Sequence, residues 1–559
     1  MNRNVESHFA NLPQVDIQRS IFDRSHRHLT TFNVGEVIPI FWDEVLPGDT
    51  VQMTTSKVIR LQTLITPIFD NIFADTYWFF VPNRLIWDHW KEFCGENNQS
   101  AWLPTATYTV PQCTIHNPGF TGYALSDYLG CPTPGTSDPD YNVSALPFRA
   151  YDQIMNDFFR SDVLTDPLNL YHGDATKYND DFGEAGMPFR AARYHDYFSS
   201  ALPAPQRGPA VSIGNAILPA GTKFPVGLGE SDVDWSILNS TGSIPSRMVA
   251  YPGDSISVSG VPKFFGSSVG SSFTQVNPLV KSTGFTSDQS YIVPSNLYAN
   301  QVDNLSLGSV SVSDLRLAFA VQKFLERDAR SGGGRYPEYL KAHYGVVSPD
   351  ASLQRPQYLG GNRIPLNVNQ VANQALNQDA ALGDLGAMSH TQDVHSDFVH
   401  SFTEHGILMG LVVLRYDHTY SQGIYRGFKR KQLYDFYDPL FASLSEQPIM
   451  KTELYYKAPE GQTFAYQECW SEYRFSNNRV SAEMRPGISG SLDSWHLADY
   501  YAYNPTLSDD WLRESKSNVD RVLAVTSSQA NQCLADFYFS AKWTRPMPMY
   551  SIPGLIDHH

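Results

Sequence analysis

Short runs of alternating apolar and polar residues, separated by turn residues, dominate residues 31–82. Residues 50–54 and 57–61 alternate in this way, and a Leu-Pro-Gly-Asp turn at 46–49 precedes them. Residues 74–82 form a dense aromatic run that ends at a proline. Strands and turns that follow one another at intervals of about 10 residues indicate a β-sandwich or barrel.

The same signature returns in the second half of the chain. Residues 398–416 predict one long buried strand, and residues 462–475 and 535–545 predict two more. The last of these lies close to the C-terminus, so strands from both ends of the chain must pair with each other. Early strands closed on late ones, with helices and loops inserted between them, are typical of a jelly roll. We therefore expect a mainly β fold.

Helical patterns interrupt the strands at four places. Apolar residues repeat at helical spacing within residues 83–94, and more clearly within residues 147–160. A third helix is predicted over residues 313–329, where a run of glycines stops it, and a fourth from Pro337 to about Gly345. We expect these helices to be insertions between strands.

Two segments stand apart by composition. Residues 1–30 are polar and predict either an extended N-terminal arm or a frayed terminus. Residues 210–310 are rich in Ser, Gly, Pro, Val and Asn and poor in Lys and Arg. A disordered linker and an ordered, β-rich surface insertion are both compatible with that composition. The recurrence of Val, Ile, Phe and Tyr favours the insertion.

The content of charged and aromatic residues narrows the range of functions that the chain could have. Charged residues make up 18% of the chain, aromatic residues make up 13%, and the formal net charge is −16. Few charges and many aromatics are typical of a chain that buries much of its surface against partners. The acidic balance disfavours a dedicated nucleic-acid binder, although a local basic patch remains compatible with it.

The cellular compartment is indicated by the cysteines and by the N-terminus. Five scattered cysteines without a CxxC pair predict reduced thiols, as in a cytosol. The N-terminal residues lack the apolar core of a signal peptide. The longest apolar run, residues 407–414, is far too short to span a bilayer. We expect a soluble protein that is not exported by a classical route and has no membrane insertion.

Candidate catalytic and metal-binding motifs are weak. His390, His395, His400 and His405 recur every five residues, a spacing that no regular element gathers on one face, so structural hydrogen bonding is favoured over a metal site. Residues 178–184 are acidic but lack the spacing of a calcium-binding loop. GxSxG, HExxH and phosphate-binding glycine motifs do not occur. We therefore expect no enzyme activity, no metal and no cofactor.

One cluster combines basic residues with aromatic ones. It comprises Arg426, Lys429, Arg430 and Lys431, with Tyr425 and Phe428 among them. Basic groups neutralise phosphates, and aromatic faces stack on unpaired bases, so the cluster is a candidate contact to single-stranded DNA. A solvated loop beside an aromatic core would give the same pattern. The sequence leaves both interpretations open.

Several long segments resemble, in the same order, the major capsid proteins of gokushoviruses, which are small single-stranded-DNA bacteriophages of the Microviridae. These segments are residues 28–50 (HLTTFNVGEVIPIFWDEVLPGDT), 73–97, 196–209, 314–346, 354–361, 400–411 (HSFTEHGILMGL) and 537–557. The likeness covers nearly the whole chain and fades at about residues 210–310.

This resemblance implies a structural major capsid protein. The expected fold is a single, eight-stranded viral jelly-roll barrel over residues 31–559, built from both ends of the chain. Many copies would self-assemble into a T=1 icosahedral capsid around a circular single-stranded DNA genome. The 210–310 insertion would project near the threefold axes, where it could contact a host cell-surface receptor.

The resemblance also implies partners and a location. The packaged DNA would touch the inner face of the shell, where the basic cluster is one candidate contact, and a separate small basic DNA-binding protein would supply much of the neutralising charge. Other minor virion proteins are expected as well. The protein would be made in the bacterial host cytoplasm and reside in the virion.

Two other classes of function are weaker. A secreted carbohydrate-binding or glycoside-cleaving β-sandwich would need an export signal and an open aromatic cleft, and the sequence lacks the signal. A zinc hydrolase using the histidine run would need a stoichiometric metal. The self-assembling coat protein is therefore the leading hypothesis.

Overall fold

The computed structural model describes most of the 559-residue chain. The described residues are 18–96, 107–116, 123–209, 312–330, 335–349, 353–374 and 385–550, with Val211, Gly383 and four short strands within residues 226–299. The chain divides into two compact units. One unit is Ala210–Gln322, and the other combines Met1–Pro209 with Lys323–His559.

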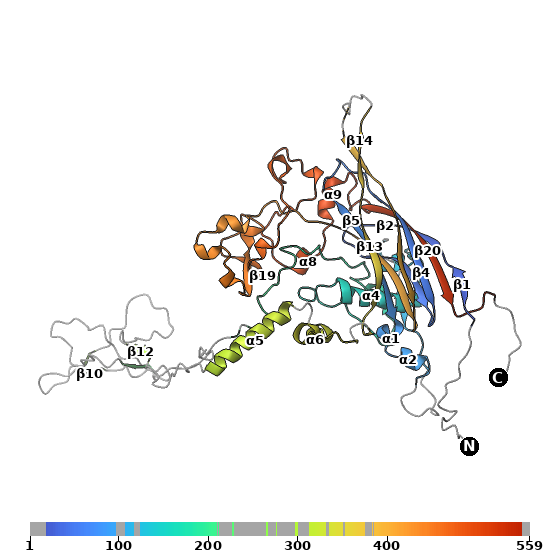
Figure 1. Ribbon diagram of the computed structural model, residues 1–559, viewed down its shortest axis with the longest axis horizontal. Coiled ribbons are helices and arrows are strands. Elements are labelled where there is room, and N and C mark those ends of the chain that lie inside the picture. Colours follow the sequence, from blue (N-terminus) through green and yellow to red (C-terminus); the bar gives the residue numbers. More distant parts are fainter. Residues whose placement is uncertain are drawn as a thin grey trace, which may run out of the picture. The chain divides into compact units, whose positions relative to one another are not determined.

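The first large sheet of the main unit joins the two ends of the chain. Its strands are β1 (Ser20–Asp23), β2 (His26–Phe32), β20 (Cys533–Arg545), β4 (Thr50–Leu61) and β16 (Thr391–Ser401). All pairs are antiparallel, β1 and β2 both pair with β20, and the order continues through β4 to β16. In Figure 1 the red β20 lies beside the blue β4, which shows this closure directly.

The second large sheet is antiparallel as well. Its strand order is β13 (Gln357–Pro365), β5 (Ile72–Pro82), β17 (Gly406–Tyr416) and β3 (Ile38–Val45). Side chains from both sheets share one apolar core, in which Trp78 of β5 packs on Phe539 of β20 with ring centroids 5.8 Å apart. The alternation along β4 and β20 supplies this core, because every second residue of each strand is buried.

Helices form a third layer on the other face of the second sheet. They are α1 (Asn83–Ile86), α2 (Trp90–Phe93), α3 (Leu125–Tyr128), α4 (Leu146–Ile154) and a closing π-helical turn (Met155–Phe159). Leu408 and Val412 of β17 face the core between the sheets, whereas Met409 and Val413 face the helices. Because β17 is buried on both faces, its sequence is a continuous apolar run instead of an alternating one.

Smaller elements complete the main unit. They include the strands β6 (Gln112–Ile115), β7 (Tyr141–Ser144), β8 (Lys177–Tyr178), β14 (Val368–Ala372), β15 (Leu385–Ser389), β18 (Glu446–Met450) and β19 (Thr463–Glu468), and the helices α6 (Tyr336–Tyr344), α8 (Asp509–Leu512) and α9 (Ser517–Val522). A third apolar cluster packs Phe198, Tyr420 and Trp511 near β19.

The other unit contains two short antiparallel pairs. These are β9 (Val226–Leu228) with β12 (Leu297–Ala299) and β10 (Phe264–Phe265) with β11 (Gln275–Val276). Helix α5 (Val312–Arg330) begins in this unit and ends in the main one. The rest of the predicted 210–310 insertion lies outside the described residues.

The mainly β prediction is confirmed, and several element boundaries differ from it. The helix predicted over residues 83–94 is two short helices, α1 and α2. The helices predicted at residues 147–160, 313–329 and 337–345 are confirmed within a few residues. The strand predicted over residues 462–475 ends at Glu468, because Trp470 has a left-handed backbone with φ 66°.

The single strand predicted over residues 398–416 is wrong. It is two strands, β16 and β17, which belong to different sheets. The connecting residues leave both ladders: the Phe402 N–H donates to the Asp49 carbonyl at 2.8 Å, and the His405 carbonyl accepts from the Asn83 N–H at 3.1 Å. A chain that crosses between two layers needs this break, which an apolar pattern alone does not reveal.

The N-terminal arm predicted over residues 1–30 lies partly outside the described residues. From Ser20 onward the chain is already in the first sheet, as β1 and then β2. Arg27 lies on the solvent side of this sheet, where it forms an ion pair with Asp536 of β20 at 2.5 Å. His28 lies on the opposite face, where Nδ1 is 2.7 Å from the Ile40 carbonyl oxygen, and His26 stacks on Phe41.

Candidate nucleic-acid interface

The predicted basic cluster follows β17 and forms a short 3₁₀ helix, Arg426–Lys429. The neighbouring segments are β18 and residues 470–479, which follow β19. Arg426 donates to the Pro448 carbonyl at 2.9 Å, and Lys429 donates from Nζ to Oγ1 of Thr452 at 2.6 Å. These bonds hold two of the predicted cations against the body of the protein.

Two arginines of the cluster are neutralised by buried carboxylates. Arg426 lies 3.3 Å from Oε1 of Glu453, and Arg430 lies 3.0 Å from Oε1 of Glu472. Both glutamates are almost fully buried. Burial raises the pKa of Glu453, and the neighbouring Arg426 opposes that rise. Arg426 and Arg430 therefore compensate internal negative charge, and this use competes with binding phosphate.

The other members of the cluster face outward. Phe428 is 82% exposed, Tyr425 is half exposed, and Lys431 is exposed. Among the described residues, the Lys431 ammonium has no ion-pair partner within 4.0 Å. The structure thus divides the six predicted residues into an internally paired group and an outward-facing group.

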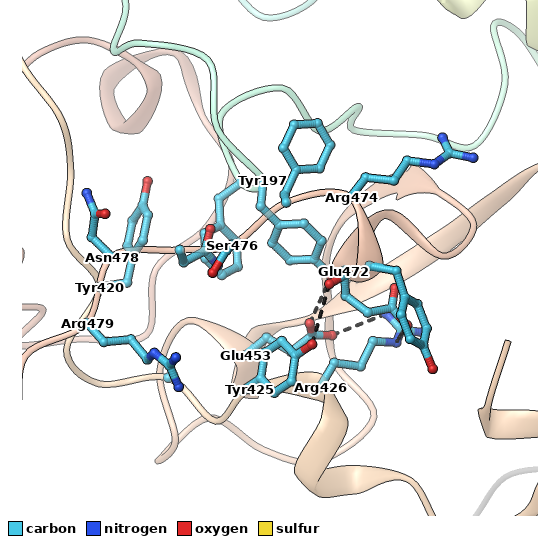
Figure 2. Close-up of a pocket in the computed structure, with 15 residues that line it drawn as sticks. Tyr197, Tyr420, Tyr425, Arg426, Glu453, Glu472, Arg474, Ser476, Asn478 and Arg479 are labelled. Carbon is cyan, nitrogen blue, oxygen red and sulfur yellow. Dashed lines mark hydrogen bonds and ion pairs between the residues drawn. The ribbon is translucent and has the colours of Figure 1, made fainter.

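A cavity of about 460 Å³ opens beside the cluster. Its walls combine aromatic side chains, such as Tyr197, Tyr420 and Tyr425, with charged and amide ones, and Glu453 and Glu472 lie against Arg426 (Figure 2). Arg474 and Arg479 extend from the segment that follows β19. Aromatic faces near cations can stack on bases and contact phosphates, so the cavity is chemically suited to a single-stranded nucleotide segment.

Sequence reasoning did not find the glutamates or Arg479. Arg479 is exposed, and no ion pair involving it occurs among the described residues. Glu453, Glu472 and Arg479 lie 27, 46 and 53 positions after Arg426, in segments without basic or aromatic periodicity. Only the packing of β18 and β19 against the cluster brings them together, so no local signal could have identified them.

The family of the chain is shown by comparison with known proteins. Residues 10–555 match the model of the capsid protein (F protein) family. The chain belongs to this capsid protein family.

Individual capsid proteins match over nearly their whole lengths. The chain is 35% identical to capsid protein VP1 of Chlamydia phage 1, with 99% of this chain and 98% of that protein covered. It is also 35% identical to capsid protein VP1 of Spiroplasma virus 4, with 96% of each covered. Capsid protein VP1 of Bdellovibrio phage phiMH2K is 34% identical, with 99% and 98% covered. These matches confirm the resemblance to gokushovirus capsid proteins.

The capsid protein is therefore a structural component of a Microviridae bacteriophage virion and not an enzyme. Its family implies self-assembly into a shell. In the part of the chain that the structure describes, no helix is long and apolar enough to cross a membrane.

The histidine run of the capsid protein is spread over separate environments. His390 accepts from Nε of Arg60 at 3.2 Å, His400 packs on Phe402, and His405 packs on Trp90. Among the described residues, no group of three or more His, Cys, Asp or Glu side chains could hold a metal ion.

The acidic segment at residues 178–184 uses its charges internally. Asp181 lies 3.8 Å from Nζ of Lys177, and Glu184 forms an ion pair with Arg513. All five cysteines are free thiols.

Proposed function

We propose that the chain forms a T=1 icosahedral shell whose subunits are eight-stranded jelly rolls. The observation that carries this proposal is the strand order of the two sheets, β2-β20-β4-β16 and β3-β17-β5-β13. The pairs β2/β3, β4/β5 and β16/β17 are consecutive along the chain, and the two members of each lie in opposite sheets. This alternation supports two interlocked Greek keys, as in viral jelly rolls.

The experiment for this proposal is direct imaging of assembled particles. The purified chain, or the virus that carries it, is expected to give isometric particles by electron microscopy. Averaging should resolve icosahedral symmetry with one subunit in each asymmetric position. Filaments, or monomers under all assembly conditions, would contradict the shell. Isometric particles with several subunits in each asymmetric position would contradict T=1 alone.

Residues 31–559 form the capsid domain in this proposal, with residues 210–310 as a variable surface insertion at the threefold axes. The insertion would contact the host receptor. The protein itself would be made in the bacterial host cytoplasm. A separate unit over Ala210–Gln322 is compatible with this role. Substitutions within residues 212–305 should reduce attachment of virus to cells and leave particle yield unchanged. If these substitutions reduced the yield of particles while the remaining particles attached to cells normally, the proposed attachment role would be contradicted.

We also propose that the shell encloses circular single-stranded DNA, which contacts the basic cluster on the inner surface. The outward-facing Lys431, Phe428 and Tyr425 support this role most, and Arg479 extends the cationic rim. Arg426, Arg430 and Lys429 act mainly by holding the cluster in shape. With a net charge of −16, the chain leaves most neutralisation to a small basic virion protein.

The DNA contact predicts a salt-dependent loss of the genome. Particles with Lys431→Ala and Arg479→Ala should release DNA at lower salt than wild-type particles, because two phosphate contacts are lost. The control is Lys91→Ala, which removes an exposed cation from α2, away from the cluster. Equal DNA release from all three particles would assign Lys431 to a solvated loop.

A further inference from the structure

An ordered loop directly after the basic cluster presents apolar side chains to solvent. It comprises residues 433–444 and includes two 3₁₀ turns, Leu433–Asp435 and Pro439–Phe441. The Asp435 carboxylate accepts from the backbone N–H groups of Lys431 and Gln432 at 2.7 and 2.8 Å. Asp438 accepts from the Leu440 N–H at 2.8 Å. The loop's own carboxylates thus fix its backbone.

One side of the 433–444 loop is anchored to the protein. Nε1 of Trp470 donates to the Phe441 carbonyl at 3.0 Å. The Tyr437 ring packs edge-on against Trp470, with centroids 5.8 Å apart, and also contacts Tyr473. The anchoring sets which side of the loop faces away from the body. The outward side chains are therefore held in place before any partner arrives, which lowers the entropic cost of binding.

The outward side is apolar and large. Its exposed fractions are 81% for Leu433, 70% for Tyr434, 50% for Phe436, 88% for Leu440 and 54% for Leu444. With about 150–250 Å² for a buried aromatic side chain, these five side chains together present on the order of 600 Å². A stable interface buries about 800 Å² from each partner, so the loop supplies most of one partner's share.

The charge of the loop distinguishes between occupants. Residues 433–444 contain Asp435 and Asp438 and no Lys or Arg, whereas the cations of the cluster all lie at or before residue 431. Two carboxylates and an apolar surface disfavour phosphates, which are bound by cations. Aromatic and apolar side chains with few charges are instead typical of the centre of a protein–protein interface.

We propose that the 433–444 loop is a contact surface between two copies of this chain and is buried against a neighbouring subunit in the shell. The proposal rests on the shell-forming role of the protein. In this arrangement the basic cluster faces the DNA. The 433–444 loop, which follows the cluster along the chain, faces the neighbouring subunit. Leu440 and Leu433, the most exposed apolar side chains of the loop, lie at the centre of the contact.

The test compares assembly of the full-length wild-type chain with that of Leu440→Asp, Leu433→Asp and the conservative control Leu440→Met. Sedimentation and electron microscopy measure the assembled fraction, and circular dichroism with urea unfolding confirms the fold of the unassembled chains. We expect at least a tenfold loss of particles for both Asp variants and normal assembly for the Met variant. Both Asp variants should remain folded, since both side chains are exposed.

Three results would overturn the interface. Particles from Leu440→Asp and Leu433→Asp at wild-type yield show that no copy binds there. If the two Asp variants form normal particles that lack DNA or a minor virion protein, the loop binds that component and not a second copy of the chain. Wild-type chain that forms no particles under any condition overturns the shell-forming role, and the interface falls with it.

Discussion

Nε2 of His418 lies 2.9 Å from Oε1 of Glu514, and both side chains are almost completely buried. The other ring nitrogen, Nδ1, lies 2.9 Å from Asp499, which also binds Arg193 at 2.7 Å. These four side chains connect the segment after β17 to three distant parts of the chain. Burial alone lowers the pKa of His418, but Glu514 and Asp499 outweigh it and raise the pKa to about 9. His418 is therefore a cation at neutral pH.

The buried network predicts a window of maximum stability at mildly acidic pH. The raised pKa of His418 stabilises the fold fully below its unfolded value of about 6.5, and this is lost as the pH rises through about 9. Burial raises the pKa of Asp499, but His418 and Arg193 hold it well below its usual range, so its stabilisation is lost as the pH falls below about 4. The network contributes most between about pH 4 and 6.5.

The measurement is urea unfolding of wild-type protein and His418→Gln across pH 5 to 10. The free energy of unfolding should differ by on the order of 3 kcal/mol at pH 5.5, and the difference should shrink as the pH rises from about 6.5 to about 9. A difference that stays constant from pH 5 to 10 would mean that His418 is not a cation in the folded protein.

At Asp152 of α4, unlike at His418, we expect a substitution that removes the charge to stabilise the protein. Its Oδ1 accepts from the Gly183 N–H at 2.8 Å, and it forms no ion pair among the described residues. Burial raises the pKa of Asp152 to about 8. A raised carboxyl pKa leaves stability intact at low pH and removes it as the pH rises from about 4 to 8. Asp152→Asn should therefore be more stable than wild type at pH 9, by roughly 2–4 kcal/mol. Thermal unfolding at pH 5 and 9 checks this, and an equal gap at both values would contradict it.

A substitution at Glu472 tests how strongly the stability of the basic cluster depends on its buried carboxylates. Glu472→Gln leaves the mostly buried Arg430 without its carboxylate partner and should cost about 3 kcal/mol in urea unfolding. The control is Glu468→Gln, which breaks the solvent-exposed pair with Arg474 and should cost less than about 1 kcal/mol. Equal costs for the two variants would show that the Glu472 pair behaves as a surface pair.

The sequence predicts the β class, the closure of the chain ends and most helices, because apolar spacing directly reflects burial on a strand or helix. The prediction from sequence fails for features that depend on contacts between distant segments. The split of residues 398–416 depends on which sheet each half joins, and apolar side chains such as Phe402 and Ile407 occur on both sides of the break. The pairing of Arg426 with Glu453 and of Arg430 with Glu472 depends on β18 and β19, so a cluster that looks free in sequence is half neutralised. The His418 network joins four segments for the same reason.

Strand β17 provides a direct test of the three-layer arrangement. Leu408 packs in the core between the sheets, and its neighbour Met409 packs against the helices, both with no exposed surface. Leu408→Ala and Met409→Ala should each cost about 2–5 kcal/mol in urea unfolding, because each leaves a cavity in a different core. The control is Val399→Ala on β16, where the side chain is exposed and the change should stay within about 0.5 kcal/mol. If Leu408→Ala alone were destabilised, the helical layer would not be packed against β17, and if Met409→Ala alone were destabilised, the core between the sheets would not be closed at Leu408.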